Sequence, residues 1–359
     1  MTTGFEYGNA RLRFLKSRLL SQKELESLIE SGSLQGLIAA LTRTVYHKPV
    51  EAALTRWTGM ECISESLHAE LVNTLGKIRS FYTGKPGETV AIVLQAYDIH
   101  NLKVILRGVS RNVPAAEILP SLLPAGEIDY HTWVELANIQ DARAVIDVIA
   151  TQGLPFAQPL LQLRASRATL NLFEMELLLN QWHMQKSLRY AKTNVRGGSI
   201  LAAAFSLESD LVNLMTALRF AHSPAERGLL RELIASDDLS QLFVGPGRLS
   251  FALLAQAGSQ NSLEAAITAL GPTTYGEVLR AGLQAHTRSG RLSDMEKGFT
   301  RYRLQWMISS IAKDPLGIGV VLGYIALKIN EVNNIHWIAQ GINIGLKADA
   351  IRAEVEFVG

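Results

Sequence analysis

An all-α fold is predicted by three observations. One helical phrase recurs three times, at residues 97–108, 209–219 and 330–341. Pro and Gly fall mainly between segments of helical apolar spacing, and alternating Val/Ile/Thr runs bounded by Asn-Gly or Asp-Gly turns are missing from the sequence. The asparagines of the three phrases lie 112 and 121 residues apart, so the unit is about a third of the 359-residue chain. A repeat of that length predicts architecture before chemistry.

Each copy of the phrase has a carboxylate three residues before an asparagine. The pairs are Asp98 and Asn101, Asp210 and Asn213, and Glu331 and Asn334. Residues three apart share a face of a helix, so each carboxylate is expected beside its amide. The first two copies continue to Arg107 and Arg219, which we include in the signature. We predict that the signature hydrogen-bonds a neighbouring helix end or loop and fixes how modules join. The alternative is that the pairs bind a ligand directly.

Other elements recur in the same order. A Leu/Ile/Ala-rich helix is predicted before a Pro-marked turn at 34–41, 139–149 and 263–270. A long amphipathic helix is expected after each turn, most clearly over 160–190, where apolar residues recur near a period of 3.6.

Three helical modules fit the length and the repeat. We predict module 1 at 1–95, module 2 at 96–208 and module 3 at 209–359, with the last helix, 331–359, packing back near the N-terminus. Residues 7–17 are interpreted as a degenerate fourth copy of the phrase, without the carboxylate or the aligned asparagine.

The charge balance argues against nucleic acid as a partner. The chain has 35 basic and 33 acidic residues, a net charge of +2, so no strong field covers the whole molecule. One local cluster is basic: Arg11, Arg13, Lys16 and Arg18. It is either a solvated helix face or a contact with an acidic partner or anionic lipid headgroups.

No disulfide within the chain and no cysteine-rich zinc site is possible, because Cys62 is the only cysteine. The first residues lack the basic and apolar regions of a secretory signal. The most apolar run, 316–327, is about half of the roughly 20 residues that span a bilayer, so we expect no membrane span.

Enzyme motifs are absent or incomplete, so we predict no catalytic residue, no cofactor and no bound metal. Gly84-Lys85-Pro86 lacks the spacing and the Ser/Thr of a phosphate-binding loop. Glu65 and His68 have the spacing found in di-iron bundles, but such a site needs a second motif and two further carboxylates. A surface pair is the better interpretation.

The order and spacing of the phrases resemble a known family, the central-stalk C subunits of archaeal and bacterial V/A-type rotary ATPases, and are similar to the d subunits of vacuolar ATPases. The resemblance spans essentially the whole chain. The segments that carry it are Asp98-x-x-Asn101-Leu102-Lys103-x-Ile105-Leu106-Arg107-Gly108, Tyr7-x-x-Ala10-Arg11-x-Arg13, and Glu331-Val332-x-Asn334-Ile335-x-x-Ile338. Two departures stand out. The third copy has Ala339-Gln340 where a basic residue is common, and residues 245–248 are interpreted as part of a longer second linker.

The resemblance implies a funnel-shaped protein of three modules about a pseudo-three-fold axis. It implies a non-catalytic rotor subunit at the cytoplasmic face of the membrane, peripheral and held there through protein partners. Those partners would be the central shaft subunits of the ATPase head and the membrane proteolipid ring. The alternatives are a helical-repeat adaptor for soluble partners, whose repeats are usually about 30 to 50 residues, and a helical-bundle enzyme with a metal or organic cofactor.

Overall fold

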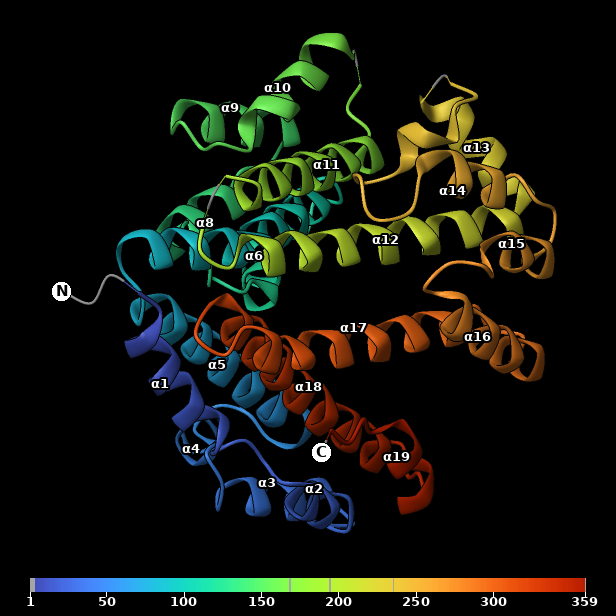
Figure 1. The fold of residues 1–359 in the computed structure, drawn as a ribbon. Coiled ribbons are helices and arrows are strands. Elements are labelled where there is room, and N and C mark those ends of the chain that lie inside the picture. The colour runs from blue at the N-terminus through green and yellow to red at the C-terminus, as the bar shows by residue number, and fades with distance from the viewer. Residues whose placement is uncertain (1–3, 168, 194, 235, 359) are drawn as a thin grey trace. The chain divides into compact units, whose positions relative to one another are not determined.

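Regular structure in the described chain is entirely helical (Figure 1). The computed structural model describes residues 4–167, 169–193, 195–234 and 236–358. These residues form nineteen α-helices and two 3-10 helices, and no strand occurs among them. The predicted all-α class is therefore confirmed for this part of the chain.

The helices divide between two compact units, and the boundaries fall inside the long helices α6 and α17. Unit 1 comprises residues 1–91 and 306–359, and unit 2 comprises residues 92–305. The helices wholly within unit 1 are α1 (Glu6–Lys16), α2 (Gln22–Ile29), α3 (Leu34–Leu41), α4 (His47–Leu54), α5 (Gly59–Ser80), α18 (Ile318–Asn343) and α19 (Ala348–Glu354). The predicted three-module division cuts the chain differently and stays a prediction.

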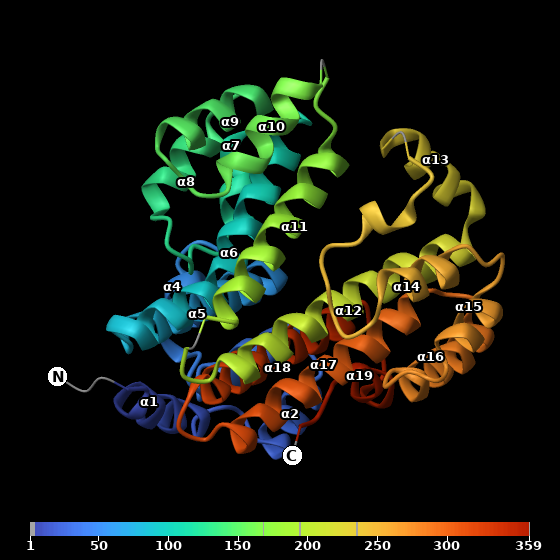
Figure 2. The same ribbon diagram turned by 45° about the horizontal axis from the view of Figure 1, so that its top comes forward.

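Unit 2 holds most of α6 (Gly84–Val109) and the first part of α17 (Ser293–Lys313). Its other helices are α7 (Ala115–Ile118), η1 (Leu119–Ser121), α8 (Tyr130–Ala137), α9 (Ala142–Thr151), α10 (Ala157–Ser166), α11 (Leu172–Ala191), α12 (Gly198–His222), α13 (Pro224–Ile234), η2 (Leu239–Leu242), α14 (Phe251–Gly258), α15 (Leu263–Leu270) and α16 (Gly276–Ser289). In both ribbon views α8, α9 and α10 gather beside α11, while α14 and α15 lie against α12 (Figures 1 and 2).

One order of elements occurs three times along the chain. Three shorter helices, which we call a three-helix group, are followed by two long helices. The groups are α2–α4, α8–α10 and α14–α16, and the long pairs that follow them are α5–α6, α11–α12 and α17–α18. The signature residues lie on the second helix of each pair, so we call α6, α12 and α18 the signature helices.

The first two helices of every three-helix group begin at a capping side chain. Ser21, Asp129 and Ser250 each accept a hydrogen bond from the backbone N–H three residues on. The second helices begin in the same way, at Ser33, Asp141 and Ser262. Such a cap satisfies one of the N–H groups that a helix start leaves unpaired, so these short helices are defined by their own sequence.

Two of the predicted short helices have the observed bounds, one is shifted, and the predicted long helix is divided in two. The predictions at 34–41 and 263–270 match α3 and α15, whereas the helix predicted over 139–149 is observed as α9, Ala142–Thr151. The predicted long helix 160–190 is two helices, α10 and α11, and the second starts where Asn171 accepts a hydrogen bond from the Phe173 N–H. Periodicity continues across this break because both helices face the same core.

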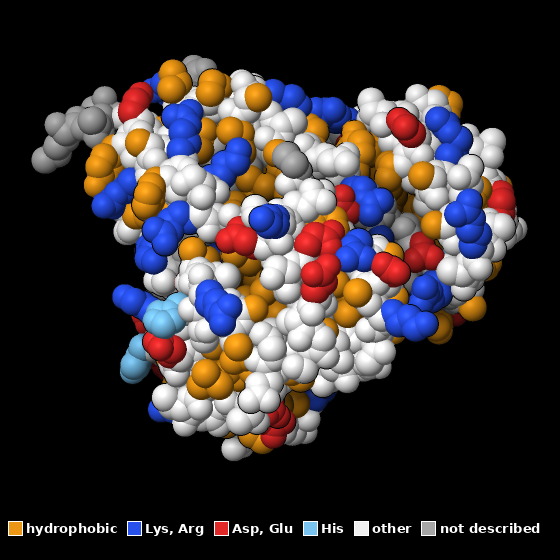
Figure 3. Space-filling model, turned by 90° about the horizontal axis from the view of Figure 1, so that it is seen from below, with side chains coloured by type: hydrophobic (Ala, Val, Ile, Leu, Met, Phe, Trp, Pro, Cys, Tyr) orange, Lys and Arg blue, Asp and Glu red, His pale blue; other side chains and the backbone are white. Residues whose placement is uncertain are grey.

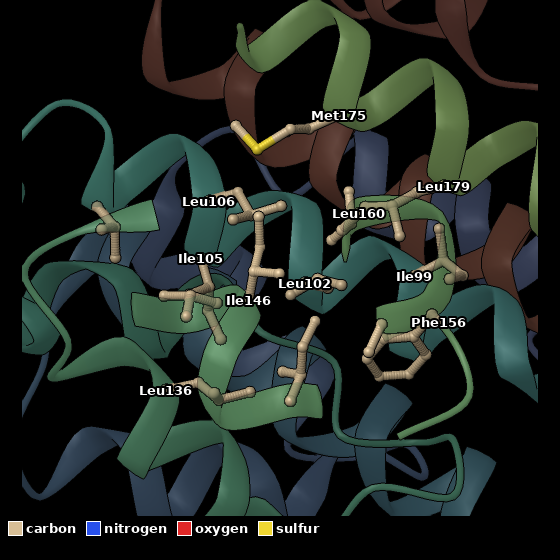
Figure 4. Packing of buried hydrophobic residues seen from close by; sticks show 14 of the residues in the cluster. Ile99, Leu102, Ile105, Leu106, Leu136, Ile146, Phe156, Leu160, Met175 and Leu179 are labelled. Atoms are coloured by element: carbon tan, nitrogen blue, oxygen red, sulfur yellow. The ribbon is translucent and has the colours of Figure 1, made fainter. Parts of the chain in front are cut away.

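Each unit has its own apolar core. In unit 2, Ile99, Leu102, Ile105 and Leu106 of α6 are buried against the α8–α10 group and α11 (Figure 4). In unit 1, buried residues of α2, α3 and α5 pack with Ile335 and Ile338 of α18. The C-terminal signature helix therefore shares a core with the N-terminal three-helix group.

Candidate functional site

The two signature aspartates hold the loop that precedes a three-helix group. Asp98 on α6 accepts hydrogen bonds from the Glu127 N–H (2.8 Å) and the Ile128 N–H (3.4 Å), just before α8. Asp210 on α12 accepts from the Arg248 N–H (2.9 Å) and the Leu249 N–H (3.1 Å), just before α14. Both carboxylates are buried, so water cannot replace these backbone donors without disruption.

Glu331 makes the corresponding contact at the other end of the chain. Its carboxylate accepts a hydrogen bond from the Leu20 N–H at 2.5 Å, just before α2. The signature helices α6 and α12 thus each bind the three-helix group that follows them in the sequence, whereas α18 binds the first group. The contact of α18 lies within unit 1 and joins residues 311 positions apart.

The side-chain amides of Asn101 and Asn213 each donate one hydrogen bond and accept another on the same loops. Asn101 donates to the Leu123 carbonyl (2.9 Å) and accepts from the Leu123 N–H (2.7 Å). Asn213 donates to the Gly245 carbonyl (2.9 Å) and accepts from the Val244 N–H (2.8 Å). Carboxylate and amide together bind backbone groups of one partly buried loop. Residues 245–248, interpreted from the sequence as a linker, are this bound loop.

Asn334 binds the C-terminal segment instead of a continuous loop. It donates to the Glu356 carbonyl (2.9 Å) and accepts from the Glu356 N–H (3.0 Å). In the other two copies the segment held by asparagine continues within four residues to the segment held by the carboxylate. On α18 these two segments are opposite ends of the chain. In the other two copies the signature closes a loop, whereas on α18 it binds residues near both termini.

A buried aromatic residue starts the third helix of each group. Tyr46 donates from its hydroxyl to Glu331 Oε1, and Tyr275 donates to Asp210 Oδ2, both at 2.7 Å. Burial is the main cause that raises the pKa of each phenol, and the hydrogen bond to a carboxylate adds to it. Phe156 holds this place in the middle group and has no hydroxyl to donate. No role was predicted for these aromatic residues from the sequence, although each lies in one of the Pro-marked turns.

Two glycines make room for the aspartates. A Cβ at Gly126 would lie 2.1 Å from Asp98 Oδ1, and a Cβ at Gly247 would lie 1.9 Å from Asp210 Oδ1. Both distances are far below van der Waals contact, so a side chain would push the carboxylate out of place. The matching position before Leu20 is Leu19. There the acid is Glu331, whose extra methylene lets the carboxylate approach from further away. Neither glycine was predicted from the sequence to have this role.

The third copy also contains a buried cation. Lys328 is 2% exposed, and its ammonium lies 2.8 Å from Glu331 Oε1 and 3.1 Å from the Tyr46 hydroxyl. Glu70 on α5 is a second carboxylate, at 3.6 Å. A buried cation needs this degree of pairing, and removing one partner of such a pair is strongly destabilising.

Each of the two signature arginines forms an ion pair between two long helices. Arg107 on α6 makes a bidentate contact with Glu176 of α11, with both bonds at 2.5 Å, and this hydrogen bonding raises its pKa. Arg219 on α12 pairs with Glu296 of α17 at 2.5 Å. The third copy has Gln340 at the corresponding position and so lacks the guanidinium. The prediction that the signature fixes how modules join stays a prediction.

The four predicted partner-contact residues Arg11, Arg13, Lys16 and Arg18 lie on or just after α1, with exposed side chains. Arg13 donates to the Pro315 carbonyl, so it is partly occupied within unit 1. The predicted fourth copy does not make the signature contacts. Asn9 instead donates to the Gly317 carbonyl (3.0 Å) and accepts from the Tyr82 hydroxyl (2.7 Å), so it fastens α1 to the start of α18.

We find no constellation of ligands for a metal in the described residues, where no group of three or more His, Cys, Asp or Glu side chains is suitably placed. Cys62 is buried, which raises the pKa of its thiol. A groove of about 460 Å³ lies in unit 2, lined by four glutamines, Trp182 and residues of the Asn213-bound loop. Gln181 is already engaged there, donating to the Gln241 and Phe243 carbonyls.

One helix of the described chain, α12, is long and apolar enough to be compared with a membrane span. Over half of its apolar window, 56%, is buried within the protein. Asp210 and Asn213 lie in the same helix and bind the loop before α14. We therefore interpret α12 as a core helix.

The fold and its contacts define an all-helical repeat protein in which long helices hold three-helix groups through buried carboxylates and amides. The family model described as "ATP synthase (C/AC39) subunit" matches residues 8–354, and the chain belongs to this family. The resemblance drawn from the sequence is thereby confirmed.

Curated relatives agree over almost the full length. The chain is 26% identical to the A-type ATP synthase C subunit of Pyrococcus abyssi, over 98% of this chain and 90% of that protein. It is 26% identical to the A-type ATP synthase C subunit of Methanosarcina acetivorans, over 99% and 93%. It is 24% identical to the V-type ATP synthase C subunit of Deinococcus radiodurans, over 99% and 92%.

Proposed function

We propose that this protein is a non-catalytic central-stalk subunit of a V/A-type ATPase. It links the rotating shaft of the soluble ATPase head to the membrane proteolipid ring and so couples ATP hydrolysis or synthesis to ion transport. The partners are the central shaft subunits above and the ring below. The protein is peripheral, at the cytoplasmic face of the membrane, and its three modules surround a pseudo-three-fold axis as a funnel.

The observation that carries this proposal is the repeated fastening of three-helix groups to the signature helices. A part that transmits torque has to resist deformation between its two ends. Asp98, Asp210 and Glu331 are each at most 4% exposed, and each accepts at least one hydrogen bond from a backbone N–H just before a three-helix group. Buried, fully paired polar contacts of this kind favour one arrangement over others. Family membership supports the same assignment.

A first experiment identifies the partners. The tagged chain is recovered from detergent-solubilised membranes of its source, and the proteins that accompany it are determined by mass spectrometry. We expect both the shaft subunits and the proteolipid of the ring. Recovery of soluble proteins without any ATPase subunit would refute the proposal and favour a helical-repeat adaptor.

A second experiment tests coupling. The membrane complex is stripped of this subunit and then rebuilt with purified chain, and ATP hydrolysis and ion transport are measured separately. Without the subunit, the head should still hydrolyse ATP while ATP-driven transport is lost, and adding the chain back should restore transport. Transport that persists without the subunit would contradict a coupling role.

A further inference from the structure

The outer face of α1 alternates aromatic and basic side chains. Tyr7, Arg11, Phe14 and Arg18 follow one another at intervals of four, three and four residues, so they lie along one stripe of the helix and its end. We call these four residues the α1 stripe. Phe14 is 61% exposed and Tyr7 is 54% exposed, although both are large rings that water solvates poorly. In the space-filling view, basic and hydrophobic side chains adjoin one another on the side where the N-terminal end lies (Figure 3).

The rings and guanidinium groups of the stripe are stacked on each other. The Arg11 guanidinium lies 5.1 Å from the centre of the Tyr7 ring and 4.8 Å from that of Phe81. The Arg18 guanidinium lies 5.8 Å from the centre of the Phe14 ring. Stacking uses the flat faces of the guanidinium groups and leaves their N–H edges able to bind an anion.

The opposite face of α1 is fixed to unit 1. Phe5, Asn9 and Leu12 are at most 1% exposed. The Asn9 contact with Gly317 and the Arg13 contact with Pro315 tie α1 to the loop before α18. The stripe is therefore presented on a rigid support and cannot turn its rings inward.

The charge around the stripe is strongly one-sided. Residues 7–23 contain five basic side chains and no acidic one. The chain has 35 basic and 33 acidic residues in all, so the remainder has 30 and 33 and a net charge of −3. Glu6 precedes this segment in the first turn of α1, and Lys23 lies on α2. The net positive charge of the chain is carried by residues 7–23, which would be attracted to an anionic surface.

We propose that the α1 stripe binds the anionic lipid surface of a membrane, with Tyr7 and Phe14 at headgroup depth and Arg11 and Arg18 on lipid phosphates. Rings interleaved with cations are typical of helices that lie at a membrane interface. Aromatic residues and Arg are also enriched at protein interfaces, so the choice of an anionic lipid surface rests on the five basic side chains and no acidic one over residues 7–23. The inference rests on the proposed function, which places the protein beside the membrane. A subunit that is already held beside the ring needs only weak contact with lipid.

The test measures binding of the purified full chain to lipid alone. Sedimentation compares vesicles of phosphatidylcholine with vesicles of equal parts phosphatidylcholine and phosphatidylglycerol at moderate salt. We expect binding to the anionic vesicles only, weakening as salt rises. Each cation near such a surface contributes about a factor of five, so Arg11→Gln with Arg18→Gln should weaken binding about 25-fold. Phe14→Ser should weaken it several-fold.

Two matched variants make the result specific. Arg43→Gln with Arg56→Gln removes the same charge from exposed positions elsewhere in unit 1 and should bind nearly like the unaltered chain. Arg11→Lys with Arg18→Lys keeps the charge and should retain most binding. Circular dichroism checks that every variant is folded.

Three outcomes would overturn the inference. They are equal binding to both kinds of vesicle, an equal loss of binding in the two Gln pairs, and no binding of the unaltered chain to either kind of vesicle. If the unaltered chain does not bind lipid and the Arg11→Gln, Arg18→Gln variant fails to recover ring or shaft subunits from membranes, the stripe binds a protein partner instead. Lipid binding and recovery of ATPase subunits are separate measurements, so failure of either proposal is recognised independently.

Discussion

Removing one hydroxyl, in Tyr275→Phe, tests the signature contact most directly. The Tyr275 hydroxyl donates to Asp210 Oδ2 at 2.7 Å, with the tyrosine 1% exposed and the aspartate 0% exposed. A hydrogen bond to a charged group contributes about 1.5–3 kcal/mol. The substitution should therefore lower the free energy of unfolding by about 2 kcal/mol.

We expect no larger loss of stability, because the fold already accommodates a phenylalanine at the corresponding position of another group. Asp210 keeps its two backbone donors, Arg248 and Leu249. The ring remains to fill the same volume, so no cavity is formed. Phe156 occupies the corresponding place in the middle group, where Asp98 is served by backbone N–H groups.

Chemical denaturation followed by circular dichroism gives the change in stability, and hydrogen exchange with mass spectrometry locates it. We expect faster exchange over 251–289 and little change over 130–166. Tyr302→Phe is the matched control, since it removes the same atom from a half-buried ring 5.5 Å from that of Tyr275. If Tyr275→Phe is no more destabilising than this control, the Asp210 contact does not stabilise the group and the reasoning is wrong.

Three further changes test other contacts. Truncation after Glu354 removes the segment bound by Asn334. Hydrogen exchange should become faster in α2–α4 and stay unchanged in α8–α10. Equal effects on both groups would contradict the inference that the C-terminal segment stabilises the first group. Phe156→Tyr adds a hydroxyl at the place from which tyrosines bind the acid in the other groups, and denaturation should show stability kept or raised, whereas a clear loss would mean that the hydroxyl does not reach Asp98. Burial, with help from nearby lysines, lowers the pKa of His183 from 6.5 to about 4, so stability present above pH 6.5 falls by roughly 3 kcal/mol as the pH drops to 4. Denaturation of His183→Gln over that range should show a flatter dependence on pH, and an unchanged slope would exclude this histidine as its source.

Much of the fold could be predicted from the sequence because its determinants are local. The caps at Ser33 and Ser262 define α3 and α15 from within a few residues, and both predicted ranges were right. The break between α10 and α11 was missed because an apolar pattern does not show where a helix stops. The signature residues were also identified in advance, since a carboxylate and an amide three residues apart are conspicuous among leucines.

The sequence by itself determined the helical class, the threefold recurrence, the short helices α3 and α15, and the residues of the signature. Only the tertiary structure decided what those residues bind. Many of their partners are backbone groups, such as those of Leu20, Leu123, Val244 and Glu356, and the type of a residue does not show what its backbone will bind. Gly126 and Gly247 matter through the side chain that they lack, which becomes visible only when a carboxylate is placed against them. The fastening of both chain ends to α18 likewise needed coordinates, because it joins positions about 300 residues apart through contacts that no local pattern encodes.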